Sequence, residues 1–238
     1  MLLQLREYSY RFVFSCIIVI GFSQAFTYAK PKQDKTRDWR TSRFESYESV
    51  MQSGLIGEVL VKVISRGGRS KRYTDLIPLD GGTVGIAHFA VGGLAMLYRE
   101  MDTEKYFARS KKEMIDKYSF ACRPSGKSGN DTGWGCYSKD WWRKGMADFL
   151  SSPDSKTVQD AAWGSMMKPV LEKAISKRWT SARQIAIALG IANSLGAGGF
   201  ETLAARRQWD AEATLRAYVG SNPHRQRREQ AINENFPK

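Results

Sequence analysis

The sequence predicts a mainly α fold of the α+β class, with one small β hairpin near residue 80. The first supporting observation is a run of apolar residues at helical spacing, made up of Leu55, Ile56, Val59, Leu60, Val63 and Ile64. The second is the segment 182–195, ARQIAIALGIANSL, whose small and apolar residues are typical of a buried helix that packs closely on its neighbours. The third is the region around residue 80, where Pro78 and an Asp-Gly-Gly triplet separate short apolar pieces and favour a turn.

The elements follow from their periodicity and their caps. The first core helix starts at Leu55 and ends at Gly67 and Gly68, and a hairpin or extended turn spans about residues 77–86. Three helices are expected next, over residues 89–101, an amphipathic segment 101–118, and residues 139–150. A longer helix is capped by Ser155 or Thr157 and runs to Trp179, and the next is capped by Thr180 or Ser181 and ends at Gly196. A short helix from Asp210 to Val219 follows, and Asn222 and Pro223 open the last helix.

Composition limits the function classes. The chain has 238 residues and a formal net charge of +13, and 42% of its residues are hydrophobic, which excludes collagen-like and wholly disordered proteins. The positive charge predicts a polyanionic partner, which can be nucleic acid, an anionic membrane surface or a cell wall.

The N-terminus favours the cell wall among these partners. Arg6 and Arg11 precede or flank a short apolar stretch over residues 12–22, and small residues follow at positions that a signal peptidase accepts. We therefore expect residues 1–29 to be a cleaved signal peptide, the alternative being an uncleaved N-terminal anchor. The exported protein is then periplasmic or secreted, which disfavours a nucleic-acid partner. No later segment is both long and continuously apolar, so no stable membrane insertion is expected after cleavage.

Residues 30–43 are charged and almost free of apolar side chains, which predicts a solvated lead-in to a single domain over residues 44–238. Cys16 lies in the predicted signal, so the exported chain keeps the pair Cys122 and Cys136. In an oxidising compartment this pair is expected to form a disulfide, which closes a Gly/Ser-rich loop and contributes roughly 3 kcal/mol. Neither His88 nor His224 lies at a ligand spacing from the cysteines, so no metal or other cofactor is expected.

The stretch DGGTVGIAHF, which starts at Asp80, is the densest unusual segment. Taken alone it suits either a cleft wall or a simple Asp-Gly turn. It resembles the small β region of the lysozyme-like superfamily, and its Asp-Gly and Thr-Gly-Ile pattern is similar to that of the bacterial chitosanases of that superfamily. The resemblance covers residues 55–100. It implies a two-lobed helical fold, with Asp80 as the second catalytic carboxylate and Thr83 as the cleft threonine.

The sequence departs from this family where the general acid is expected. The helix end around Gly67 and Gly68 has no Glu, and the nearest upstream carboxylate is Glu58. Glu58 lies opposite the apolar stripe and four residues before Lys62, so it is either the acid or a solvated ion pair. Glycoside cleavage generally needs an acid and a second carboxylate. Glu100, Glu104 and His88 are the alternative proton donors.

Other residues suit a glycan ligand. Trp134, Tyr137 and Trp141 lie near the second cysteine and offer faces for stacking on sugar rings, whereas the adjacent Trp142 is expected in the core. His88 is a candidate cleft residue. The basic clusters at residues 206–207 and 225–228 suit the carboxylates of a cell wall, although such clusters are usually only solvated.

Two functions remain after this reasoning. The first is a secreted glycoside hydrolase that cleaves β-1,4 bonds of an amino-sugar polymer, with peptidoglycan favoured over cationic chitosan because of the protein's charge. The alternative is a non-catalytic glycan-binding or secretion-associated protein that keeps the fold but lacks the acid. The sequence indicates no oligomeric state.

Overall fold

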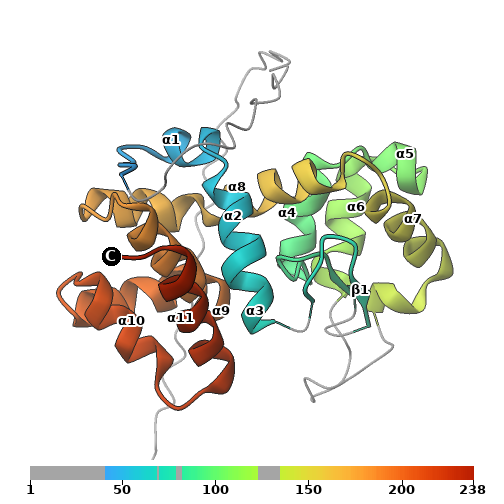
Figure 1. Ribbon diagram of the computed structural model, residues 1–238. Helices are drawn as coiled ribbons and strands as arrows, with labels where there is room; N and C mark the ends of the chain where they lie inside the picture. The colour runs from blue at the N-terminus through green and yellow to red at the C-terminus, as the bar shows by residue number, and fades with distance from the viewer. Residues whose placement is uncertain (1–40, 69, 79–81, 123–134) are drawn as a thin grey trace, which may run out of the picture. The chain divides into compact units, whose positions relative to one another are not determined.

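The computed structural model describes residues 41–238 except 69, 79–81 and 123–134 (Figure 1). The predicted signal peptide 1–29, most of the lead-in, Asp80 and Trp134 lie outside the described residues. The described part is mainly helical and contains one two-stranded antiparallel sheet, as the sequence predicts.

The elements have the following bounds. The helices are α1 (Tyr47–Gln52), α2 (Leu55–Val59), the π-helical turn η1 (Leu60–Ile64), α3 (Ser65–Gly67), α4 (Gly92–Glu100), α5 (Thr103–Phe107), α6 (Lys111–Tyr118), the 3₁₀ turns η3 (Phe120–Cys122) and η4 (Gly135–Ser138), α7 (Asp140–Leu150), α8 (Ser155–Ser176), α9 (Ala182–Arg206), α10 (Ala211–Val219) and α11 (Pro223–Asn235). The strands are β1 (Leu76–Ile77) and β2 (Thr83–Val84).

The first core helix is confirmed as the continuous run α2, η1 and α3. Its apolar stripe is buried, with Leu55, Leu60 and Ile64 fully inaccessible to solvent. The middle turn is π-helical, a local irregularity that often marks functional sites. The helix ends at Gly68, whose backbone is extended, so the two glycines stop the helix as expected.

The hairpin near residue 80 is also confirmed. Leu76 pairs with Val84 and Ile77 with Thr83. Val84 also exchanges two backbone hydrogen bonds of 2.9 Å with Phe89, which closes a tight turn over Gly85 and His88. This second pairing corrects the prediction that the next helix starts at Phe89, because α4 starts only at Gly92.

Three further boundaries differ from the expectation. The amphipathic segment 101–118 is two helices, because Ala108 has a left-handed backbone (φ 52°) that ends α5. Helix α8 follows Asp154 and ends at Ser176 rather than Trp179. Gly196 interrupts α9 with φ 72° and ψ 173°, and a helical segment that the sequence did not predict continues to Arg206.

The described end of the predicted lead-in is not fully solvated. Ser42 is buried, and Arg43 forms a β-bridge with Ser181 at the start of α9. The short helix α1 was not predicted, although a capping box between Ser46 and Ser49 marks its start.

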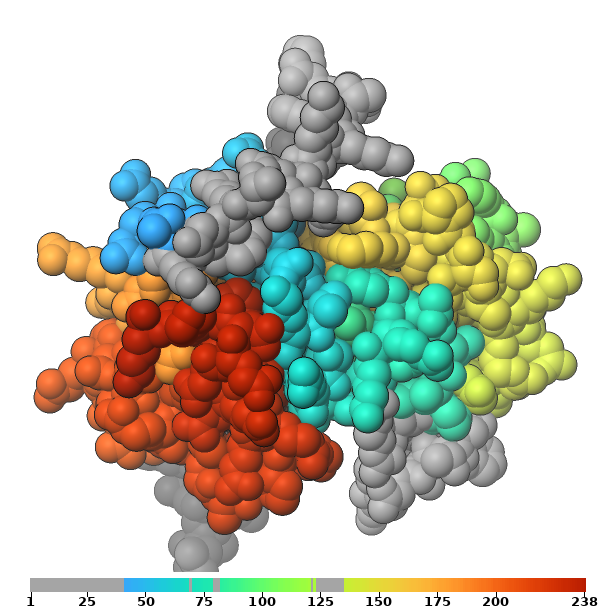
Figure 2. Space-filling view, viewed as in Figure 1, coloured from blue at the N-terminus to red at the C-terminus, as the bar shows by residue number. Residues whose placement is uncertain are grey.

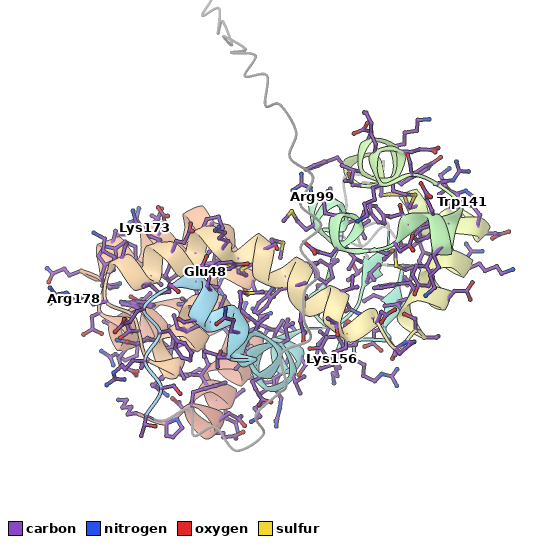
Figure 3. The ribbon with its side chains drawn as sticks, turned by 90° about the horizontal axis from the view of Figure 1, so that it is seen from above. Glu48, Arg99, Trp141, Lys156, Lys173 and Arg178 are labelled. Atoms are coloured by element: carbon purple, nitrogen blue, oxygen red, sulfur yellow. A yellow bond between two sulfur atoms is a disulfide. The ribbon has the colours of Figure 1, made fainter. Side chains whose placement is uncertain are left out.

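Helices α8 and α9 form the centre of the core. Helix α8 packs on both α4 and α9, and Figure 3 shows Lys156 and Lys173 near its opposite ends. The predicted buried central helix is confirmed, since the residues of α9 from Ile185 to Ala192 are buried. In the described part of the chain, no helix has both the length and the apolar character needed to span a bilayer.

Candidate functional site

The main candidate site is a pocket of about 550 Å³ at the end of the first core helix. It lies where the end of α3, the turn after β2, the middle of α8 and of α9, and the start of α11 meet. Figure 2 shows the surface of α11, in red, beside the cyan surface of the first core helix, and contacts of α11 with η1 and α3 agree with this view.

The pocket is lined by both apolar and polar groups. The apolar groups, here called the apolar wall, belong to Phe89, Met166, Met167, Val170, Ala192 and Ala197, and the polar groups, here called the polar wall, are the backbone of Gly67 and Gly68 and the side chains of His88, Asn193, His224 and Arg228. Ligand sites commonly combine an apolar surface with a few convergent polar groups in this way.

His88 lies directly on the end of the first core helix. A Cβ on Gly68 would lie 2.0 Å from the imidazole, so the ring occupies the space that a side chain at this position would need. Nε2 of His88 is 3.0 Å from the carbonyl oxygen of Ser70, which only accepts, so Nε2 carries the proton and donates it. Ser70 in turn donates to the carbonyl of Gly85 and ties the ring to the hairpin turn.

The turn that carries His88 is strained. His88 has φ 61°, and Val91, three residues later, has φ 47° and ψ −113°, a conformation that is a true outlier for a β-branched residue. Such outliers cluster at ligand sites, where the surrounding structure holds them in place. The strain here lies next to the pocket and agrees with a functional role for it.

The side chain of Arg228 packs against Gly67 in the same way as the imidazole of His88 packs against Gly68. The residue is 5% exposed, and a Cβ on Gly67 would lie 2.3 Å from its Nε. The guanidinium donates through Nη1 to the carbonyl of Gly190 and to the hydroxyls of Ser194 and Tyr218. The glycine pair therefore leaves room for two basic side chains that come from distant parts of the chain.

Asn193 and His224 complete the polar wall. The side-chain carbonyl of Asn193 accepts from the indole of Trp163 at 3.2 Å, which leaves its amide group as a donor. Nδ1 of His224 is 3.1 Å from the carbonyl of Gly67 and 2.8 Å from the guanidinium of Arg227. This nitrogen either donates to the former or accepts from the latter, depending on the tautomer.

The polar wall is rich in donors and carries positive charge. Among the described residues that line the pocket there is no Asp or Glu. Because Arg228 is permanently charged, the pocket favours a ligand that is neutral or anionic and rich in acceptors.

Glu58, the predicted acid, does not line this pocket. Its carboxylate forms an ion pair of 2.7 Å with Lys62, and its side chain is 39% exposed, so the i,i+4 pair is the arrangement in the structure. Burial and the nearby carboxylates of Asp160 and Glu58 raise the pKa of Tyr73, whose hydroxyl donates to Asp160 at 2.6 Å. Glu58 thus lies beside a contact between α8 and the segment before the hairpin.

The structure separates the remaining candidates. Thr83 is buried in β2 and is not part of the pocket lining, and Asp80 lies outside the described residues. Glu100 and Glu104 are exposed, on α4 and α5, and neither lines the pocket. Of the predicted catalytic and sugar-binding residues that are described, His88 alone lines the pocket, together with Arg228 from the predicted basic cluster 225–228.

The aromatic candidates lie elsewhere. Tyr137 and the fully buried Trp142 lie within 4 Å of a Cβ built on Gly82, so they pack beside the hairpin turn. Trp142 is a core residue, as predicted, and donates to the hydroxyl of Tyr98. The guanidinium of Arg109 lies over the ring of Trp141 at 4.5 Å, which covers a face that a sugar would need.

Cys122 and Cys136 form a disulfide with their Cα atoms 4.9 Å apart. In the described part of the chain, no group of three or more His, Cys, Asp and Glu side chains is arranged to hold a metal ion.

Sequence reasoning did not single out Asn193. It interpreted the glycine pair only as a helix stop, and it treated Arg228 as one member of a basic cluster. One signal for Arg228 was present. It precedes the buried Ala231 and Ile232 by three and four residues, which places it on the buried face of α11.

Comparison with known proteins found no family model, curated protein or solved structure that matches the chain.

Proposed function

We propose that this protein binds an amino-sugar glycan of the peptidoglycan type in the pocket between α3, α8, α9 and α11. The observation that carries the proposal is that the pocket lining combines apolar side chains with hydrogen-bond donors. Sugar rings present apolar faces and many oxygen acceptors, so this lining matches both sides of such a ligand.

A lysozyme-like fold is part of this proposal. A helix that ends in the glycine pair, a short hairpin and a following helix occur in the order that the resemblance implies, and strand β2 of the hairpin lies within the DGGTVGIAHF motif. The formal net charge of +13 favours an anionic wall polymer over a neutral or cationic one. Export to the periplasm or the medium belongs to the same proposal, since the polymer is found there.

Hydrolysis of the β-1,4 bond is the second candidate, and the Asp80 motif beside the buried Thr83 favours it. Binding ranks first because the space at the helix end, where the resemblance requires an acid, is filled by His88, and because Glu58 pairs with Lys62. A hydrolytic route would need Asp80 and a proton donor such as His88.

Two measurements on protein purified after export test these candidates. Cosedimentation with peptidoglycan sacculi at fixed salt is expected to show saturable binding, and its absence would refute the proposal. Release of reducing ends in the presence of a chelator tests hydrolysis. If hydrolysis occurs, Asp80→Asn should lower the turnover about a hundredfold or more while binding changes little.

A further inference from the structure

Arg228 lines the pocket, and part of its guanidinium has no hydrogen-bond partner among the described residues. Its Nη1 makes all three of its hydrogen bonds. Among the residues that the structure describes, neither Nε nor Nη2 has a hydrogen-bond partner, and no carboxylate forms an ion pair with the guanidinium. The residue is 5% exposed, and its permanent charge therefore has no counter-ion within the described part of the chain.

This situation is costly for a folded protein. Removal of an ion from water costs several kcal/mol even after relaxation, and a partner carboxylate normally offsets that cost. Arg183, the other buried arginine among the residues that the structure describes, follows the rule. Its guanidinium donates to both oxygens of Glu212, at 2.6 and 3.0 Å, and also to Asn233 and to the carbonyl of Phe236. Arg228 departs from the rule, and it does so beside the pocket.

The geometry of the guanidinium indicates what is missing. The Nε–H and one N–H of Nη2 point in the same direction from one edge of the planar group, and this edge matches the two oxygens of a carboxylate. Gly67 stands beside Nε, where any larger residue would collide with it. The amide group of Asn193 and the imidazole of His224 line the same pocket and can donate to further oxygens of a ligand.

We propose that Arg228 binds a carboxylate of the glycan, so that the pocket selects acid-bearing sugar polymers over neutral ones. This inference rests on the proposed glycan-binding function and deepens it by naming the class of substrate. In peptidoglycan a carboxylate has two sources, the lactyl group of a muramic acid freed of its peptide and the peptide stem itself. The shared chemistry is a carboxylate carried on an amino-sugar strand.

The test compares ligands that differ in this group. Four soluble strands of equal length are titrated calorimetrically at fixed salt: a peptide-free strand with its lactyl acids, the same strand converted to carboxamides, a strand with intact stems, and an N-acetylglucosamine oligomer. The wild type is expected to bind one acid-bearing strand about 10- to 100-fold more tightly than the carboxamide, as a charge-assisted contact implies. If the peptide-free strand binds more tightly, the lactyl group supplies the carboxylate; if the strand with intact stems binds more tightly, the peptide stem supplies it.

Variants assign the preference to the residue. Arg228→Gln is expected to reduce the preference for the acid to less than threefold, and Arg228→Lys to restore only part of it because lysine lacks the planar pair of donors. Arg216→Gln, an equal charge change at an exposed position of α10, is expected to keep the preference. The wild-type comparison of acid with carboxamide needs no variant, so it stands even if a substitution at Arg228 prevents folding.

The outcomes separate the two proposals. Equal wild-type affinity for the acid-bearing, carboxamide and N-acetylglucosamine strands, or an undiminished preference in folded Arg228→Gln, would overturn the role of Arg228 and leave glycan binding intact. A wild type that binds none of the four strands would overturn glycan binding itself, and the inference with it.

Discussion

Replacement of Arg183 or Arg228, the two buried arginines among the described residues, by methionine is expected to have unequal consequences for stability. Arg183→Met removes four hydrogen bonds and leaves the Glu212 carboxylate without its main partner. Loss of one member of a buried pair costs about 3–5 kcal/mol. Because the Glu212 side chain is 30% exposed and Lys238 remains 3.7 Å away, we expect a loss of about 2–4 kcal/mol by that principle.

Arg228→Met leaves no comparable defect. The hydroxyls of Ser194 and Tyr218, which accept from Arg228, also bond to each other at 2.8 Å, so both keep a partner. Removal of the unpaired charge recovers its desolvation cost, which offsets the lost bonds. The expected change lies between a loss of about 1 kcal/mol and a gain of similar size.

Urea unfolding followed by circular dichroism gives both free energies, with Arg216→Met as the exposed control that should change by less than about 0.5 kcal/mol. The two buried variants should differ by at least about 1 kcal/mol, which corresponds to roughly 2–4 °C in Tm for a domain of this size. If Arg228→Met destabilises the protein as much as Arg183→Met does, then Arg228 is a structural residue and the reasoning fails.

Three further results are expected. In protein purified after export and alkylated without reduction, mass spectrometry should find neither Cys122 nor Cys136 modified, and two labelled thiols would exclude the disulfide in solution. Glu58→Gln should change glycan binding and any hydrolysis less than twofold, because Glu58 does not line the pocket and its carboxylate forms an exposed pair with Lys62; a large loss in a folded variant would place Glu58 in an active site. The hydrogen bonds from Arg183 lower the pKa of Glu212 below its usual 4.5, so the stability that the pair contributes should be complete above that value and be lost as the pH falls below it. The difference in unfolding free energy between wild type and Glu212→Gln should therefore shrink from pH 6 to pH 3, and a constant difference would contradict the linkage.

The local elements were predictable because their signals are local. The apolar stripe of the first core helix, the caps at Ser181, Asp210 and Asn222, and the Asp-Gly-Gly punctuation each depend on a few neighbouring residues. The errors in the fold come from backbone conformations that composition does not encode. Ala108 adopts a left-handed conformation that is uncommon for any residue except glycine, and its identity gave no warning of a helix end.

The site was less predictable, because it depends on contacts over long sequence separations. Gly67 contacts a residue of α11, and Gly68 contacts one of the hairpin turn, so neither glycine shows its role in its own segment. A basic run such as that at 225–228 is usually solvated, so the sequence did not indicate that Arg228 is buried at the pocket. The resemblance directed attention to Asp80 and Glu58, whereas the described pocket is lined by His88 and by residues of the C-terminal helices.

The glycine pair, Gly67 and Gly68, explains both why this helix end has no general acid and why Arg228 fits beside it. At this helix end a general acid would need a side chain and room for it, but His88 lies where a Cβ of Gly68 would be, and Arg228 lies where one of Gly67 would be. A Glu introduced at position 68 would have to displace a ring whose Nε2 is bonded to Ser70. Because Gly67 and Gly68 carry no side chain, this helix end provides no carboxylic acid. The same lack of side chains leaves room for His88 and Arg228. If the fold is lysozyme-like, as proposed, the cleft in which the resembled family protonates a glycosidic oxygen is lined here with donors and positive charge. Such a lining favours an anionic ligand and offers no carboxyl proton from this helix end.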